Sequence, residues 1–216
     1  MQKLTELLDV RKLTLIVELP SNELALAKAA VDAGADVLQL TGNFEIEKDN
    51  LAAIVKAVEI PVGYYSPEAI SEDDFAAAVK MKFDYLNVQE KNAPPFILKS
   101  KKISKVLSLD SRFSLEKITD LAGQGGEALD AAIIPSSTWG KNLVVGDLQN
   151  YISIILSAGI PVIIPTERAI KISEVPIIAD TGAKGLLLTS VVTGTTAAHL
   201  AKAVGEFRAA IDDLAD

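Results

Sequence analysis

The fold is decided near the end of the sequence, by residues 182–196, which read GAKGLLLTSVVTGTT. Leu186 to Leu188 form a short apolar run, as in a strand that is buried on both faces of a parallel sheet. Hydroxyl residues and Gly194 follow this run, and a helical pattern begins after them. We therefore interpret residues 185–189 as the last strand of a barrel. A turn at the carboxyl end of such a strand presents backbone N–H groups, which suit a phosphate or a carboxylate.

The alternation that ends at this strand extends back through the whole chain. Eight apolar or alternating segments are predicted to be strands: residues 13–19, 37–41, 60–65, 84–89, 103–110, 130–134, 160–164 and 185–189. Helical spacing and capping signals predict helices around them: residues 2–10, 20–33, 50–58, 71–81, 93–102, 114–122, 147–158, 168–182 and 196–214. Strands joined by helical crossovers run parallel, and eight of them close economically into a barrel.

Short repeats at the strand starts favour this closed arrangement. Ile-Pro-Val begins the third and seventh predicted strands, at residues 60–62 and 160–162. An aspartate begins the second, fourth and sixth: Asp36, Asp84 and Asp130. Such recurrence indicates quarter-barrel units. We predict an α/β protein with one (β/α)8 TIM barrel domain over residues 1–216 and a short N-terminal helix that plugs the barrel floor. A doubly wound open sheet is the alternative.

The composition limits the classes of function. Hydrophobic residues make up 49% of the chain, which is enough to bury a sizeable core. The chain has no cysteine and one histidine, which excludes thiolate chemistry and His-pair metal sites. We expect no metal site and no required cofactor, although carboxylate-held Mg²⁺ is compatible with the composition. A net charge of -8, with neither a signal peptide nor a membrane-spanning run, leads us to expect a cytoplasmic protein without nucleic-acid or membrane partners.

Candidate catalytic residues stand at the carboxyl ends of predicted strands, where TIM barrels carry their chemistry. Glu18 ends an apolar strand, where loss of water would raise the pKa of its carboxyl group toward that of a general base. Asp110 ends another apolar strand, and its alternation with Ser108 predicts that it faces inward. We expect Glu18 or Asp110 to move a proton. A solvated carboxylate at the rim is the alternative for Glu18. Glu167 either serves at the mouth or caps the next helix. Asn87, near the end of the fourth strand, completes the predicted catalytic set.

Candidate ligand-binding residues surround the turn after the last strand. The predicted set is Thr189, Ser190, Thr193 and Gly194, joined by Thr166, Gln39 and Trp139. Ordinary helix capping is the alternative for the turn, with Thr195 or Thr196 as the cap. Trp139 lies in a long loop that either closes over a ligand or packs in place. Lys105 is predicted to face a helix, and His199 to have an ordinary helical role.

Several segments carry a resemblance to a known family. They are residues 35–40 (ADVLQL), 60–62 (IPV), 84–90 (DYLNVQE), 134–138 (IPSST) and 190–194 (SVVTG). From about residue 13 to 210, the chain resembles the phosphate-binding TIM-barrel superfamily, and most of all thiamine-phosphate synthase and TenI-like proteins. The resemblance implies a barrel with a phosphate-binding site after its last strand. Gln39 corresponds to a glutamine that the family has on its second strand.

The chain departs from this family at the catalytic motifs. Thr41 and Asn43 stand where the family has the basic residues that hold pyrophosphate. Around Tyr65 and Ser66, the acidic Mg²⁺-binding residues that the family has after its third strand are replaced, and the Gly-Gly of the seventh strand is missing. We expect an enzyme that acts on a small phosphorylated metabolite by isomerase, lyase or transferase chemistry. One alternative is a non-catalytic ligand-binding or regulatory barrel that has lost the ancestral activity. Another is a homo-oligomeric structural subunit, marked by apolar patches on its outer helices.

Overall fold

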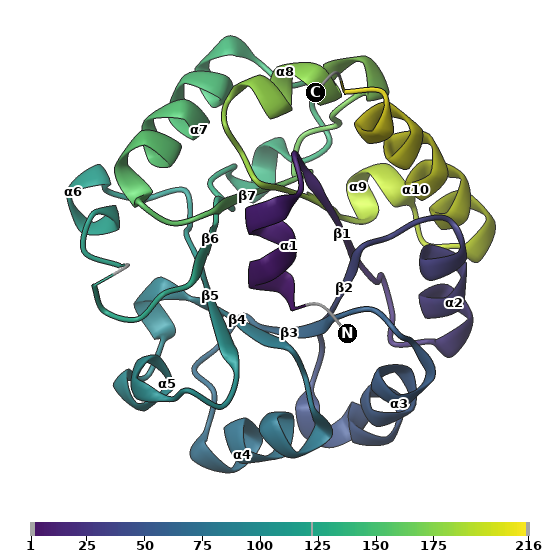
Figure 1. The fold of residues 1–216 in the computed structure, drawn as a ribbon, viewed down its shortest axis with the longest axis vertical. Helices are drawn as coiled ribbons and strands as arrows, with labels where there is room; N and C mark the ends of the chain where they lie inside the picture. Colours follow the sequence, from purple (N-terminus) through teal and green to yellow (C-terminus); the bar gives the residue numbers. More distant parts are fainter. Residues whose placement is uncertain (1–2, 122, 215–216) are drawn as a thin grey trace.

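A closed ring of eight parallel strands forms the centre of the computed structural model, which describes residues 3–121 and 123–214. Each strand pairs with its neighbour in sequence, and β1 pairs with β8 (Figure 1). The strands are Thr14–Glu18 (β1), Val37–Leu40 (β2), Val62–Ser66 (β3), Tyr85–Gln89 (β4), Ser104–Ser108 (β5), Ala128–Asp130 (β6), Val162–Pro165 (β7) and Gly185–Leu188 (β8). The predicted (β/α)8 TIM barrel is confirmed.

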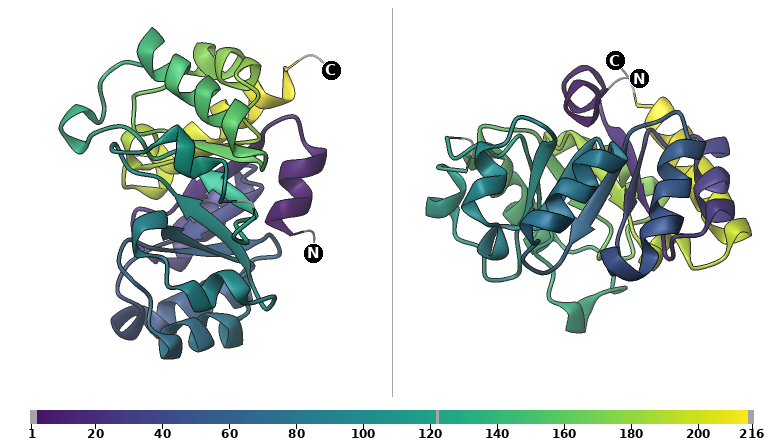
Figure 2. Two further views of the ribbon diagram at one scale, coloured as in Figure 1. Left: turned by 90° about the vertical axis from the view of Figure 1, so that its left-hand side faces the viewer. Right: turned by 90° about the horizontal axis from the view of Figure 1, so that it is seen from below.

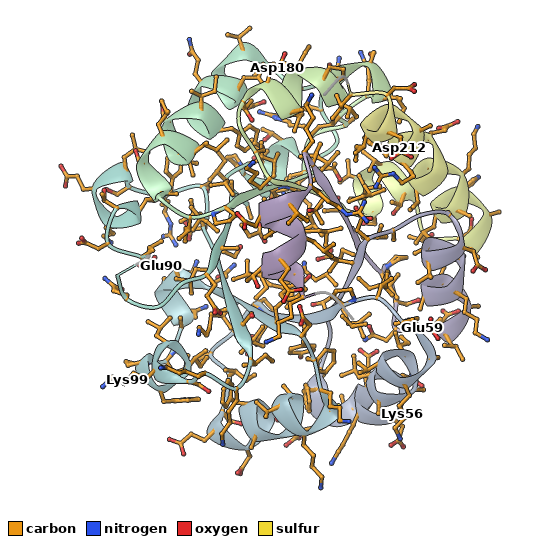
Figure 3. All side chains as sticks on the ribbon, viewed as in Figure 1. Lys56, Glu59, Glu90, Lys99, Asp180 and Asp212 are labelled. Atoms are coloured by element: carbon orange, nitrogen blue, oxygen red, sulfur yellow. The ribbon has the colours of Figure 1, made fainter. Side chains whose placement is uncertain are left out.

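Helices surround the barrel, and their polar faces point outward. They are Leu24–Asp32 (α2), Phe44–Ala57 (α3), Glu72–Met81 (α4), Pro95–Lys99 (α5), Leu115–Ile118 (α6), Val145–Ala158 (α7), Val175–Asp180 (α8), Ser190–Thr193 (α9) and Ala197–Asp212 (α10). Figure 3 shows charged side chains such as Lys56, Lys99 and Asp180 at the outer margin of the molecule. The apolar faces pack against the outside of the sheet, where the larger of two buried clusters lies.

The remaining helix, Leu4–Val10 (α1), lies across one end of the barrel (Figure 2). Leu4, Leu7 and Leu8 are buried in a cluster with inward-facing strand residues. The carboxylate of Asp84 accepts the Leu4 N–H at 2.7 Å and so anchors the start of the helix. This confirms the predicted plug of the barrel floor and leaves the opposite end, at the carboxyl ends of the strands, open for a site.

Barrel closure depends on a glycine beside a large interior side chain. Tyr85 is fully buried inside the barrel, and Gly63 lies next to it on β3. A Cβ atom on Gly63 would lie 2.1 Å from the Tyr85 ring, so the absence of a side chain there makes room for the ring.

The predicted sixth strand was wrong in its position. Residue 130 ends β6 instead of beginning it, because Asp130 is paired with Ser108 and Ile163 at the carboxyl edge of the sheet. The apolar residues 131–134 form a buried connection beyond the strand. The N–H of Ile134 finds its partner in the Glu167 carboxylate rather than in a neighbouring strand. The aspartate repeat at strand starts therefore fails at this position.

Several helix boundaries also differ from the prediction. The helices predicted over 93–102 and 114–122 are shorter, Pro95–Lys99 and Leu115–Ile118. α3 begins at Phe44 rather than at residue 50, because Asn43 Oδ1 accepts the Ile46 N–H at 3.0 Å as an N-cap. α2 has neither the predicted serine nor the predicted asparagine as its cap. The helix predicted over 168–182 is reduced to a 3-10 turn and α8, in which Pro176 stands within the first turn, where its missing N–H costs nothing.

Candidate active site

The carboxyl ends of the strands surround a cavity of about 490 Å³, called the mouth here. Its polar lining includes Glu18, Gln39, Tyr65, Gln89, Lys91, Ser108, Asp110, Arg112, Asp130, Ser136, Glu167 and Thr189. The lining comes from every strand or from the segment that follows it. Glu18 and Asp110 both line the mouth, as the sequence predicted.

Glu18 stands at the end of β1 with its carboxyl group largely removed from water. Burial raises its pKa, and a hydrogen bond from Gln39 Nε2 at 2.9 Å opposes this in part. Since Glu18 is neither fully solvated nor in an ion pair with any described residue, it has the environment expected of a proton-transferring group.

Two amide side chains connect Glu18 to a second carboxyl group across the barrel. Asn87 Nδ2 donates to Gln39 Oε1 at 3.1 Å and to Asp130 Oδ2 at 2.8 Å. Gln39 in turn donates to Glu18, so a row of hydrogen bonds runs from β1 to β6. Asn87 is fully buried below the mouth and does not line it. We therefore assign Asn87 to positioning the carboxyl groups rather than to contact with a ligand.

Asp130 is an acidic site residue that the sequence did not predict; the sequence did not predict Lys91 and Arg112 of the mouth either. Burial raises its pKa to about 7, the nearby charge of Glu18 adds to this, and hydrogen bonds with Asn87 and Ser108 oppose it. Its Oδ1 atom is buried without a hydrogen-bond partner among the described residues, although the side chain lines the mouth. The available signal was the inward alternation of Ala128 and Asp130, which was hidden when residue 130 was taken as a strand start.

Glu167 follows β7 and faces the same mouth. Burial raises its pKa to about 8, and the charges of Asp130 and Glu18 add to this, while Arg168 opposes it. Its Oε2 atom accepts the Ile134 N–H at 2.9 Å. The alternative role as a helix cap is not seen, because the next helical turn begins at Ile172.

Arg168, which follows Glu167 in the chain, forms its ion pair with another carboxylate. The Arg168 guanidinium donates to both carboxylate oxygens of Asp147, at 2.8 and 3.0 Å, and to the Thr138 carbonyl at 3.1 Å. Within the described ranges, none of Glu18, Asp130 and Glu167 takes part in an ion pair. Three carboxyl groups with raised pKa values thus share one side of the mouth.

Asp110 has the opposite environment. Lys91 Nζ lies 2.7 Å from its carboxylate, and Arg112 contacts the same group through its guanidinium at 3.4 Å and its backbone N–H at 2.8 Å. These donors lower the pKa of Asp110 to about 2. The expectation that Asp110 acts as a general base is therefore corrected: a carboxylate held ionised by two cations accepts a proton poorly at neutral pH.

The hydroxyl groups after β8 are largely used within the turn. Thr189 caps α9, its hydroxyl donates to the Thr166 carbonyl at 2.9 Å, and its N–H donates to the Thr166 hydroxyl at 2.8 Å. The Thr193 hydroxyl is buried and contacts the Thr189 carbonyl at 3.1 Å. These bonds join β7 to β8 and make the turn rigid.

The predicted phosphate set is consequently divided between two places. Gln39, Trp139 and Thr189 line the mouth, and Thr166 is buried behind it. Ser190 is exposed and is not part of the mouth lining. Thr193 and Gly194 instead border a separate surface hollow with His199 and Lys202. Phosphate binding at the turn stays a prediction.

The loop after β6 is packed rather than open. Trp139 Nε1 donates to the Ile134 carbonyl at 2.9 Å, and the Gly140 N–H donates to the Glu167 carbonyl at 2.9 Å. The Trp139 ring is half exposed and borders the mouth. Lys105 points away from the site, as predicted, and its Nζ lies 3.3 Å from Glu127. Nothing in the described part of the chain groups three or more acidic, His or Cys side chains as a metal site.

Known proteins share this fold at low sequence identity. Thiamine phosphate pyrophosphorylase from Pyrococcus furiosus is 19% identical with a TM-score of 0.70, over 94% of this chain and 97% of that one. A structure described as native KDPGal is 18% identical with a TM-score of 0.71, over 94% and 96%. Tryptophan synthase from Mycobacterium tuberculosis is 15% identical with a TM-score of 0.73, over 98% and 99%.

No protein-family model matches the sequence. No curated protein is significantly similar to it. At these identities the likeness establishes the fold, and the fold likeness to thiamine-phosphate synthase is confirmed. Because one barrel fold carries many chemistries, the function has to be argued from the site. No helix in the described ranges has both the length and the apolar character needed to cross a membrane.

Proposed function

We propose that this chain is an enzyme that moves a proton on a small phosphorylated metabolite, as in isomerase or lyase chemistry. One observation carries the proposal: Glu18, Asp130 and Glu167 come from three separate strands to one cavity, and burial raises the pKa of each. Keeping several poorly neutralised acids buried destabilises a fold, and such groups gather at functional sites.

The three acids can divide the work of an acid and a base. A carboxyl group with a pKa of about 8, as in Glu167, holds its proton at pH 7 and can donate it to a carbonyl oxygen of the substrate. Asp130, whose pKa is about 7, or Glu18 can accept the proton from the carbon beside that carbonyl. With an α-hydroxy carbonyl substrate the intermediate is an enediol. In an isomerase the protonated base then gives its proton to the neighbouring carbon, and the ionised Glu167 takes a proton from the other hydroxyl, which becomes the new carbonyl. Asn87 and Gln39 hold the two bases in position through hydrogen bonds.

Support for a phosphorylated substrate comes from the fold and from the mouth itself. The name of one protein with this fold, thiamine phosphate pyrophosphorylase, refers to a phosphate compound. The mouth also carries two cations, Lys91 and Arg112, which can attract a phosphate. No cofactor is needed for this chemistry, and a requirement for Mg²⁺ stays untested. The cytoplasmic location is likewise a prediction.

Hydrogen–deuterium exchange tests the proposal without knowledge of the full reaction. Phosphorylated aldoses and ketoses of three to six carbons are incubated with the protein in D₂O, and the C–H beside the carbonyl is followed by NMR. We expect exchange with at least one compound, and a loss of about 10²- to 10⁴-fold in Glu167→Gln and in Asp130→Asn. Glu127→Gln, outside the barrel, is the matched control and should keep the wild-type rate.

Absence of exchange for every compound, under conditions in which one of them binds, would contradict the proposal and favour the second candidate. That candidate is a non-catalytic ligand-binding barrel. The turn after β8 favours it, because the Thr189 and Thr193 hydroxyls already donate to backbone carbonyls and have no hydrogen left for a phosphate.

A homo-oligomeric state also stays a prediction. The exposed apolar side chains of Val145, Ile152 and Leu156 on α7 are the surface on which such an interface would be sought.

A further inference from the structure

The charges around the mouth are unevenly distributed. The β1, β6 and β7 side carries Glu18, Asp130 and Glu167. The cations among the described lining residues, Lys91 and Arg112, both lie in the segments after β4 and β5, and β5 is the neighbour of β6. A phosphate dianion placed beside the three acids would meet the negative charge of whichever of them is ionised, in a poorly solvated site, whereas the cations after β4 and β5 attract it.

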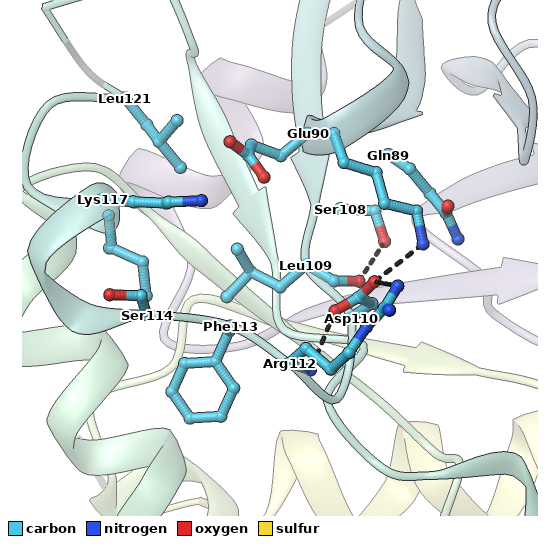
Figure 4. A pocket seen from close by; sticks show the side chains of 12 residues that line it. Gln89, Glu90, Ser108, Leu109, Asp110, Arg112, Phe113, Ser114, Lys117 and Leu121 are labelled. Carbon is cyan, nitrogen blue, oxygen red and sulfur yellow. Dashed lines mark hydrogen bonds and ion pairs between the residues drawn. The ribbon is translucent and has the colours of Figure 1, made fainter.

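A smaller cavity extends the mouth on this cationic side. It has a volume of about 210 Å³ and shares with the mouth Gln89, Lys91, Ser108, Leu109, Asp110 and Arg112. Lys117 of α6 lines it as well, and Figure 4 shows Lys117 and Arg112 on either side of the Leu109 side chain. Lys117 forms no ion pair with any residue in the described part of the chain.

The charges of this cavity leave an excess of positive charge. Lys91 and Arg112 share a single carboxylate, that of Asp110, so one of the two positive charges is not neutralised. Lys117 and Glu90, which also line the cavity, offset each other. The net charge of the lining is therefore one positive unit. The shared contact holds the Lys91 and Arg112 head groups near each other before any ligand arrives, which reduces the entropy lost on binding an anion.

We infer that the phosphate group of the substrate binds at Lys91 and Arg112, between the segments after β4 and β5, with Lys117 lining the same cavity. The inference rests on the proposed function, because it names where that substrate is held. The ligand it describes is a phosphate monoester long enough to reach from this cavity to the acids across the mouth. Asp110 then has a positioning role: it holds the two cations and does not touch the reacting carbon.

Calorimetric titration with inorganic phosphate tests this location. Lys91→Met and Arg112→Met should each weaken phosphate binding by about tenfold, because each loses one charge-assisted hydrogen bond. Lys202→Met and Gly194→Val, in the hollow after β8, are the matched controls and should leave the phosphate affinity unchanged. Lys91 and Arg112 are largely exposed, so these variants should fold, and thermal melting checks this.

Weaker binding in the Lys202 or Gly194 variants, with no effect at Lys91 and Arg112, would overturn the inference and place the phosphate at the turn after β8. An affinity that none of the variants changes would overturn it as well. The exchange assay reports separately on the acids. Phosphate affinity that depends on Lys91 without any C–H exchange would reject the proposed function and keep the binding site. C–H exchange together with a phosphate affinity that does not depend on Lys91 would keep the proposed function and reject the binding site.

Discussion

Asp130 and Asp110 are chemically identical residues with opposite acidities in this fold. Asp130 is almost fully buried beside other acids, and its pKa rises to about 7. Asp110 lies near the surface between two cations, and its pKa falls to about 2. Both follow apolar strand residues in the sequence, so local pattern alone does not distinguish them. The difference comes from the surroundings in the fold. Burial, with the charge of Glu18 added, raises the pKa of Asp130, whereas hydrogen bonds from Lys91 and Arg112 lower the pKa of Asp110.

The raised pKa values predict that the protein becomes less stable as the pH rises. An unfolded aspartate ionises near a pH of about 4, whereas folded Asp130 keeps its proton up to about pH 7, so the folded state binds more protons between these values. The stability that this proton supplies is present in acid and is lost as the pH rises through 7. Glu167 extends the same effect to about pH 8.

Substitution of Asp130 by asparagine should remove its part of the loss of stability with rising pH, because an amide does not ionise. The amide oxygen can still accept the hydrogen bond from Asn87. We expect Asp130→Asn to be more stable than the wild type at pH 9, by at most about 4 kcal/mol, with a much smaller difference at pH 4. Urea unfolding at the two pH values measures it. A constant difference between the two proteins at both pH values would show that Asp130 has an ordinary pKa.

At the scale of single elements, α1 is a plug that the barrel requires. Leu8 is fully buried, and its Cδ2 atom approaches Gly185 of β8 so closely that a Cβ on this glycine would lie 3.1 Å from it. The helical spacing of Leu4, Leu7 and Leu8 predicted this face. The partner surface, made by inward-facing residues of several strands, is a product of barrel closure.

Leu8→Ala should therefore lower the free energy of unfolding by about 2 to 5 kcal/mol, through lost burial and the cavity that remains. Val10 stands on the same helix and is 69% exposed, so Val10→Ala should change stability by less than about 0.5 kcal/mol. Denaturant unfolding compares the two. If Leu8→Ala were as mild as Val10→Ala, the helix would not serve as the barrel floor.

On the scale of the whole molecule, a buried ion-pair group joins the two ends of the chain. The carboxylate of Asp36 accepts the Leu15 N–H at 2.8 Å and lies 3.0 Å from Arg11 and 3.1 Å from Arg208. Arg208 belongs to α10, the last helix, whereas Leu15 belongs to the first strand. The group therefore fastens the closing helix to the place where the barrel begins.

Breaking this group should destabilise the fold without touching the mouth. Asp36→Asn is expected to cost about 3 kcal/mol, because it removes the buried counter-charge of the partly buried Arg208 and leaves only an exposed one, that of Asp212. Asp212 pairs with the same arginine but is 65% exposed, so Asp212→Asn should cost less than about 1 kcal/mol. Thermal and urea unfolding measure both. Equal losses would mean that burial does not distinguish the two ion pairs.

The sequence by itself determined the eight-fold alternation, the floor helix, and the placement of Glu18 and Glu167 at strand ends. These follow from hydrophobic spacing and from chain order, which are local properties. The tertiary structure decided which acids share a site and how acidic each is. Asp130 joins Glu18 only because strand register and barrel closure bring the carboxyl ends of β6 and β1 to the same cavity. Its pKa then depends on burial by distant segments, which no short stretch of the sequence contains.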